Sequence, residues 1–269
     1  MATVEKRSPE AEGQPASILS KAFDVLGAFG PDQRVLTLTE IARASGLPKS
    51  TVHRLLHRLI PLGVIEPHGS GFKVGLPMRR LSSAMPIESL RQSALPHLGQ
   101  LHRWSGRHVH LGGLRGSRVV FVERFLLPGR ELPSASPGTD IAAYATALGK
   151  AMLAFLTPEE LADVLAEPME ALAPNTVTDP EDLLAELRQV RQRRVAFARG
   201  ESHPDVTCVA APIIVRGRAV SAISVSTTAR DTAIDRALVE AVCTAAHRIA
   251  RDNERVLAEG NDSWFPGID

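Results

Sequence analysis

Cationic and hydroxyl side chains are concentrated in one short segment, KSTVHRLLHRL, at residues 49–59. If this segment is helical with Val52 on its buried side, a step of 100° per residue places Ser50 and Arg54 on the opposite face. The DNA major groove admits one helix, and an arginine there can donate two hydrogen bonds to O6 and N7 of guanine. The segment therefore predicts a DNA-recognition helix in which Arg54 is the main base reader.

Other polar side chains near this segment suit contacts with phosphates, which position a protein on DNA without reading its sequence. Ser50 and His53 are the secondary candidates for base contacts. The full set of residues expected to contact DNA is Lys49, Ser50, Thr51, His53, Arg54, Arg58 and, further along the chain, Lys73. The alternative interpretation is a charged helix face that only water covers.

Positive charge is unevenly distributed along the chain. Between residues 49 and 80 six lysines and arginines are accompanied by a single acid, Glu66, whereas the whole chain of 269 residues has a formal net charge of +1. Arg79 and Arg80 close this basic stretch and are placed to meet the flanking DNA backbone. A local basic stretch in a nearly neutral chain is typical of a nucleic-acid-binding module joined to a different domain.

Two helices are expected before the basic segment. Apolar residues recur at helical spacing from Ser17 until Gly30 and the proline after it end the pattern. Thr37 and Glu40 have the spacing of a capping box, in which each side chain accepts a hydrogen bond from the other residue's amide. They predict a short second helix over residues 38–46.

A glycine turn and a hairpin flank the basic helix. The turn is Ser45-Gly46-Leu47, and Pro48 suits the first turn of the helix that follows. After this helix two short extended runs, 64–67 and 72–74, are joined by glycines and predict a hairpin. Helix, helix, tight turn, helix and hairpin in this order predict a winged helix-turn-helix.

The rest of the chain favours an α+β domain built on an antiparallel sheet, because hairpins and helices are segregated along it. The expected helices contain Leu90 to Leu101, span about 146–155, begin after Thr157 and after Asp179, and span about 231–259. The expected hairpins span 108–125 and 208–227, with turns at Arg115-Gly116-Ser117 and Arg216-Gly217.

Composition excludes several classes of protein. No run of about 18 apolar residues is present, and the polar first residues lack the pattern of a secretory signal, so a cytoplasmic protein is expected. The two cysteines, Cys208 and Cys243, have neither metal-ligand spacing nor the density of a disulfide scaffold. Neither a P-loop nor a dinucleotide glycine pattern is present, so no cofactor is expected.

An enzyme is the remote alternative. His108 and His110 lie two apart on an expected strand, share a face and could bind a metal together with His203 or Glu123. Cys208 with a nearby histidine could form a thiol nucleophile, but no residue is identified as its base or oxyanion donor. We expect no catalytic residue and no metal site.

Several motifs together resemble one protein family. GLPKSTVHRLL, with LTEIA before it, is similar to the helix-turn-helix of the IclR family of bacterial transcription regulators. ATALGKAMLAF, TCVAAPI and AISVS are similar to the successive landmarks of that family's effector-binding domain. The resemblance runs in order from about Ser17 to the last helix.

This resemblance implies a regulator with a winged helix-turn-helix and a GAF-like C-terminal domain that holds a small organic ligand. It also implies dimers that pair into tetramers and bind palindromic double-stranded DNA operators. The expected organisation is a disordered tail at 1–16, the winged helix-turn-helix at 17–77, a linker helix region at 78–92, the effector-binding domain at 93–260 and a C-terminal tail at 261–269.

The resemblance also assigns residues to the ligand pocket. Ala147 and Leu148 match positions whose backbone amides face the ligand, Cys208 matches the pocket cysteine, and Ser224 and Ser226 match a pair of serines. A helix that begins at Ala147 and Leu148 offers free backbone amides and the positive end of its dipole to a carboxylate. The two serines, two apart on a strand, present their hydroxyls to one side. A small carboxylate is therefore the expected ligand.

The sequence departs from the family pattern in two places. Ala198 and Arg199 stand where the family usually carries acids, which predicts that Arg199 pairs with an acidic effector. Tyr144, the only tyrosine, stands where many members have histidine and is either a pocket hydroxyl or a packing residue. The alternative for the whole domain is that it only oligomerises and binds no ligand.

Overall fold

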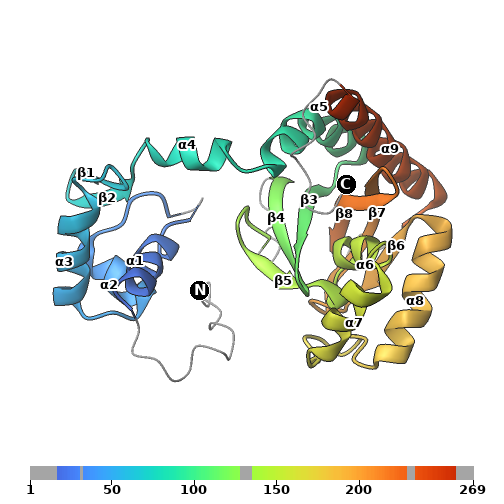
Figure 1. Cartoon of the computed structure of the whole chain (residues 1–269), viewed down its shortest axis with the longest axis horizontal. Coiled ribbons are helices and arrows are strands. Elements are labelled where there is room, and N and C mark those ends of the chain that lie inside the picture. Colours follow the sequence, from blue (N-terminus) through green and yellow to red (C-terminus); the bar gives the residue numbers. More distant parts are fainter. Residues whose placement is uncertain (1–16, 31–32, 128–134, 229–233, 259–269) are drawn as a thin grey trace. The chain divides into compact units, whose positions relative to one another are not determined.

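The computed structural model describes residues 17–30, 33–127, 135–228 and 234–258. The chain divides into two compact units, Met1–Met85 and Pro86–Asp269 (Figure 1). The tails expected at 1–16 and 261–269 lie outside the described residues. Within the described ranges no helix is both long and apolar enough to cross a membrane.

The first unit is a helix-turn-helix followed by a two-stranded wing, as predicted. Its elements are α1 (Ile18–Gly27), α2 (Leu38–Ser45), α3 (Lys49–Leu59), β1 (Ile65–His68), β2 (Gly71–Val74) and α4 (Met78–Ser83). Gly46 makes the turn between α2 and α3 with a φ of 69°, a left-handed conformation that glycine adopts without strain. Val25, Ile41 and Val52 form the centre of a core that the three helices share.

The start of α2 is fixed by the expected capping box. Thr37 Oγ1 accepts a hydrogen bond from the Glu40 amide at 3.3 Å, and Glu40 Oε2 accepts one from the Thr37 amide at 2.8 Å. Thr157 and Glu160 make the same box at the start of a helix in the second unit. The two units therefore contain matched caps.

Thr37→Ala is expected to lower the free energy of unfolding of the first unit by about 1 kcal/mol, because an orphan amide at the start of α2 loses its acceptor. Hydrogen exchange resolved by peptide will show faster exchange in α2. The matched control, Thr157→Ala, will accelerate exchange only in the second unit. Unchanged exchange of α2 in Thr37→Ala would contradict this role for the cap.

The second unit is an α+β domain with one six-stranded antiparallel sheet in the order β5-β4-β3-β8-β7-β6. Its helices are α5 (Ile87–Ser105), η2 (Ala143–Ala145), α6 (Ala147–Leu153), α7 (Pro158–Ala166), α8 (Pro180–Arg193) and α9 (Arg236–Ala258). Its strands are β3 (His108–Arg115), β4 (Arg118–Phe125), β5 (Asp140–Ala142), β6 (Ala196–Arg199), β7 (Val206–Val215) and β8 (Arg218–Thr228). The predicted fold class is thus confirmed.

Helices cover both faces of this sheet, so the unit has two cores. In Figure 1, α5 and α9 lie over one face and α6 lies over the other. Val109 and Leu111 point to the α5/α9 face, whereas Ala210 and Ala222 pack with α6. Alternate side chains of a strand point to opposite faces of the sheet. The residue between Val109 and Leu111 in β3 therefore faces α6, and the residues next to Ala210 and Ala222 in β7 and β8 face α5 and α9.

Several elements differ from the sequence-based expectations, among them two edge strands and the start of the last helix. The edge strands β5 and β6 were not predicted, because each is short. The last helix begins at Arg236 rather than at residue 231, which lies outside the described residues. Asp235 Oδ1 accepts a hydrogen bond from the Leu238 amide at 2.8 Å, so an aspartate cap sets the later start.

Candidate functional site

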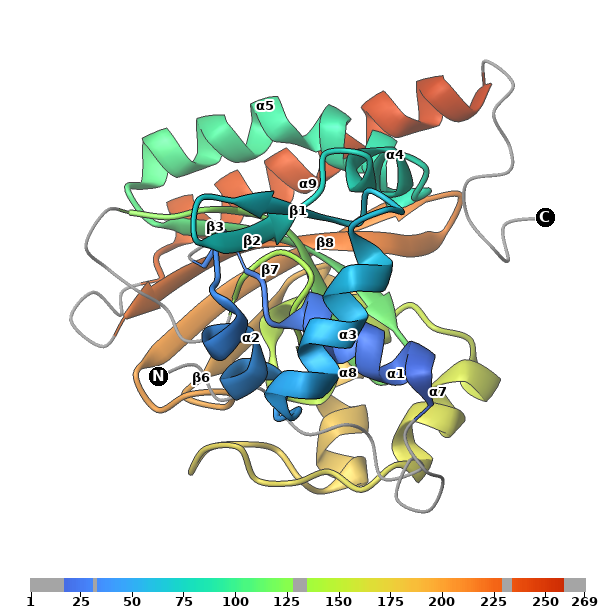
Figure 2. The same cartoon turned by 90° about the vertical axis from the view of Figure 1, so that its left-hand side faces the viewer.

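The helix α3 exposes its polar side chains and buries its apolar ones. Lys49, Ser50, His53, Arg54, His57 and Arg58 are exposed, and Thr51 is half-buried. Val52, Leu55, Leu56 and Leu59 are buried in the core shared with α1 and α2. The cationic face is therefore on the surface of the first unit, where α3 is seen in Figure 2.

The first turn of α3 adds a second source of positive potential. Pro48 occupies the cap position without a side-chain cap, and the first turn contains no acidic residue. The unpaired amides at a helix start carry partial positive charge and attract phosphates. Lys49 lies at the same end, so backbone and side chain act with the same sign.

The wing carries its cation in an ion pair. Lys73 Nζ lies 3.4 Å from Glu66 Oε2, and the register of β1 and β2 pairs these two residues directly. Glu66 also accepts a hydrogen bond from the Leu76 amide at 3.1 Å. This bond and then Lys73 hold the pKa of Glu66 below its usual value. Arg79 and Arg80 are exposed on α4.

A second polar cluster lies on the sheet face covered by α6. Cys208 and Ser226 are paired in register across β7 and β8, and Cys208 Sγ lies 3.1 Å from Ser226 Oγ. Ser224 is on the same face two residues earlier, and both serines are buried. Burial raises the pKa of Cys208 to about 11, so its thiol is protonated at neutral pH and is a poor nucleophile.

The start of α6 lies against this face. Ala147 and Leu148 are its first two residues and are buried, and Thr146 caps the helix by accepting a hydrogen bond from the Gly149 amide at 2.9 Å. A Cβ added at Gly112 of β3 would lie 3.2 Å from Leu148 Cδ1, which shows how closely α6 approaches the sheet.

Tyr144 is buried in the short helix before α6. Its hydroxyl donates a hydrogen bond to the Glu170 carbonyl at 2.9 Å. Burial, more than any other cause, raises the pKa of Tyr144. Of the two expectations for this residue, its hydrogen bond and apolar contacts favour the packing role.

The structure does not bring Arg199 together with the cysteine and the serines. Ala198 is paired with Cys208 and shares its face, so Arg199, the next residue of β6, points to the opposite face. Its guanidinium is 5.1 Å from the centre of the Phe197 ring. Arg199 therefore does not share the face of Cys208, and its expected pairing with an acidic effector stays a prediction.

His108 and His110 share a face of β3, as expected. Both are buried, and His108 Nδ1 accepts a hydrogen bond from the Leu127 amide at 3.3 Å. Glu123 instead pairs with Arg91 of α5 at 2.5 Å. No group of three or more potential metal ligands occurs in the described part of the chain.

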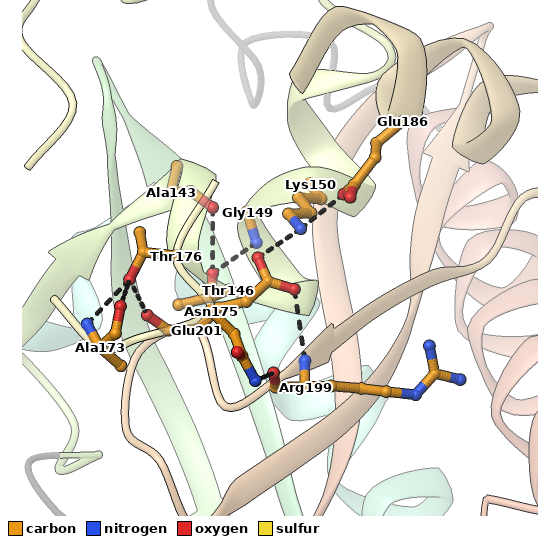
Figure 3. A network of polar contacts seen from close by, with 10 residues as sticks. All are labelled: Ala143, Thr146, Gly149, Lys150, Ala173, Asn175, Thr176, Glu186, Arg199 and Glu201. Carbon is orange, nitrogen blue, oxygen red and sulfur yellow. Dashed lines mark hydrogen bonds and ion pairs between the residues drawn. The ribbon is translucent and has the colours of Figure 1, made fainter. Parts of the chain in front are cut away.

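A buried network of charged side chains, centred on Lys150 of α6, was not predicted from the sequence. Lys150 is 1% exposed and forms ion pairs with Glu201 at 2.5 Å and with Glu186 at 2.6 Å (Figure 3). Thr176 donates to the Glu201 carbonyl, and Asn175 donates to the Arg199 carbonyl. Figure 3 also shows the Arg199 side chain leading away from these contacts. A lysine within the apolar run ATALGKAML was the available signal.

This network ties three separate segments together. Lys150 belongs to α6, Glu186 to α8, and Glu201 to the connection between β6 and β7. A buried ammonium without a partner costs free energy. Lys150 therefore keeps the carboxylates of Glu186 and Glu201, and the segments that carry them, in place. The network therefore positions the helix whose first turn lies beside the serines and the cysteine.

Both units match models of the same protein family. Residues 18–69 match the family model described as the IclR helix-turn-helix domain. Residues 83–251 match the model described as bacterial transcriptional regulator IclR C-terminal.

Relatives and solved structures agree with these matches. The chain is 36% identical to the HTH-type transcriptional regulator BhcR of Paracoccus denitrificans over 83% of this chain and 84% of that protein. An IclR homolog of Microbacterium hydrocarbonoxydans, solved in complex with 4-hydroxybenzoate, matches with a TM-score of 0.77 and 28% identity over 89% of this chain and all of that one. The IclR structure of Thermotoga maritima matches with a TM-score of 0.70 and 26% identity over 88% and 98% of the two chains.

Proposed function

Because this chain belongs to the IclR family of bacterial transcriptional regulators, we propose that it reads a palindromic operator through α3 and responds to a small carboxylate. It is a helix-turn-helix transcriptional regulator of the IclR type. The observation that carries the operator proposal is the exposed cationic face of α3 over a well-buried apolar face. A protein that acts on DNA in this way works in the cytoplasm.

The roles proposed for the DNA-facing residues follow from their positions. Arg54, central on the exposed face, reads a base, and Ser50 and His53 assist it. Lys49, Thr51 and Arg58, with Lys73 of the wing, hold phosphates. Two copies of α3 related by a two-fold axis would read the two half-sites of the operator. The distance between these helices in a homodimer or homotetramer would set the spacing of the half-sites.

The proposed effector site is the sheet face under α6. Cys208, Ser224 and Ser226 present polar atoms there, beside the first-turn amides of Ala147 and Leu148. A solved relative holds 4-hydroxybenzoate, a small aromatic carboxylate. Coupling of about 1–3 kcal/mol between the effector and DNA would change operator affinity roughly 5- to 150-fold. We ascribe no catalytic step to the chain.

An electrophoretic mobility shift assay on the DNA upstream of the chain's own gene tests this proposal, with and without 4-hydroxybenzoate, benzoate and butyrate. Retardation of this DNA but not of random DNA, altered by one of the acids, is the expected result. Operator binding that no acid changes, together with no rise in melting temperature, would favour a C-terminal domain that only oligomerises. Equal affinity for all DNA would overturn sequence-specific reading.

Lys73→Ala is expected to weaken binding to operator and to random DNA by the same factor, because a phosphate contact carries no sequence information. The slope of log affinity against log salt concentration should fall by about 1. Lys21→Ala, which removes the same charge from α1, is the matched control and should leave the slope unchanged. The same loss of slope in both variants would assign the effect to net charge instead of to the wing.

A further inference from the structure

His110 is a buried polar residue with one unsatisfied nitrogen. It lies on β3, on the sheet face that α6 covers, and is 2% exposed. Its Nδ1 is 3.4 Å from Ser226 Oγ. Its Nε2, on the other side of the ring, has no hydrogen-bond partner among the residues that the structure describes. Buried polar atoms are normally paired, so this nitrogen calls for a partner that the described residues do not supply.

The surroundings of His110 are those of the proposed effector site. β3 and β8 pair His110 directly with Ser224, and Ser226 is paired in turn with Cys208. The Phe121 ring lies edge-on to the imidazole, with ring centres 5.6 Å apart. Gly112, the next residue of β3 on this face, is where Leu148 of α6 approaches. One apolar wall and four polar side chains therefore converge beside α6.

The protonation of the cluster indicates which atoms carry hydrogen. Burial, and after it the nearby charges of His108 and Arg124, lowers the pKa of His110 to about 3, so the ring is neutral at pH 7. The Cys208 thiol, with its pKa raised to about 11, keeps its proton. A ring nitrogen of neutral histidine either donates or accepts, and the neighbour of Nδ1 decides which.

Either atom of the Cys208–Ser226 contact can be the donor, and the role of His110 Nδ1 depends on the ring tautomer. We assign the donor role to the Cys208 thiol, because the hydroxyl oxygen is a better acceptor than sulfur, and the Ser226 hydroxyl is then left to donate to His110 Nδ1. The remaining proton of the neutral ring is therefore on Nε2. In this assignment Nε2, which has no partner among the described residues, is a donor and needs an acceptor.

We propose that His110 Nε2 donates a hydrogen bond to a carboxylate oxygen of the effector, which makes His110 a specificity-determining residue of this site. This inference rests on the proposed function, in which the domain binds a small organic acid. A ligand without an acceptor at this point leaves the buried N–H unpaired, and a site built to form a hydrogen bond rejects such ligands strongly.

Two conservative variants of the full-length chain separate the two ring nitrogens. In His110→Asn the side-chain amide reaches the place of Nδ1 and keeps the contact with Ser226, but nothing replaces Nε2. In His110→Gln the longer side chain places its amide near Nε2. Binding of 4-hydroxybenzoate, benzoate and butyrate is measured by calorimetry, and melting curves without ligand verify that each variant is folded.

The expected result is that the acid bound by the wild type loses about 10- to 150-fold in affinity with His110→Asn, the range for a hydrogen bond to a charged group. His110→Gln should restore most of this loss. Equal affinity of the wild type and His110→Asn would overturn the role of His110 and leave the proposed function intact. If none of the three acids binds the wild type, the proposed ligand class fails, and this inference fails with it.

Nitrogen-15 spectra of the histidine rings give a readout that does not depend on the variants. Wild-type His110 should be neutral at pH 7 with its proton on Nε2, and this resonance should shift when the bound acid is added. A proton on Nδ1 instead, or an Nε2 resonance that saturation with a bound acid leaves unchanged, would overturn the proposal.

Discussion

Arg54→Ala is expected to weaken operator binding roughly 5- to 150-fold, the equivalent of about 1–3 kcal/mol for one bidentate contact with guanine. Binding to random DNA should fall much less, because the exposed guanidinium of Arg54 is assigned to a base and not to a phosphate. Titrations of the operator and of random DNA at one salt concentration measure both affinities. Their ratio, the specificity, should decrease.

Arg58→Ala is the matched control for this prediction. Arg58 is exposed on the same helix and carries the same charge, but its proposed partner is a phosphate. It should lose affinity for both DNAs by a similar factor. If Arg54→Ala also loses equally on both, Arg54 is not a base reader.

Gly149→Ala is expected to destabilise the second unit by about 3 kcal/mol, the upper end of the usual cost of overpacking. A Cβ at Gly149 would lie 2.0 Å from the Ala143 carbonyl oxygen and 2.4 Å from Ala143 Cα. These are backbone atoms, so no side-chain rotation relieves the clash, and α6 must shift. The melting temperature of this unit should fall by roughly 6–12 °C.

Gly113→Ala provides the comparison for Gly149→Ala. Among the described residues, a Cβ at Gly113 would meet only Val122 Cγ2, at an ordinary contact distance of 3.9 Å. Calorimetry should therefore show a small change for this variant. A Gly149→Ala protein that melts within a degree or two of the wild type would contradict the close approach of α6 to η2.

Local signals in the sequence predicted most of the fold. Thr37, Thr157 and Asp179 mark helix starts because a cap bonds to amides two or three residues away, a distance that sequence spacing determines. The strand β6 has no such signal, because its four residues are held by pairing with β7 and by other contacts distant in the sequence, such as the hydrogen bond from Asn175. Non-local pairing of this kind leaves no trace in a short window of sequence.

The candidate sites show the same distinction. The face of α3 follows from helical periodicity, and the clustering of Ser224 with Ser226 follows from strand alternation. Lys150 and Glu201 are 51 residues apart in the chain, so only the folded sheet brings them together. The position of Arg199 was open to prediction, because placing Ala198 on the face of Cys208 sends its neighbour to the other side.

The burial of Lys150 also determines where amine chemistry can act on this protein. The chain has five lysines, Lys6, Lys21, Lys49, Lys73 and Lys150, and only the last belongs to the second unit. Its ammonium is enclosed by two carboxylates and 1% exposed, so acylating reagents and acetyl-transferring enzymes do not reach it in the folded state. Lysine modification of the native chain will therefore neutralise lysines of the first unit, Lys49 of α3 among them, while the second unit keeps its native charge.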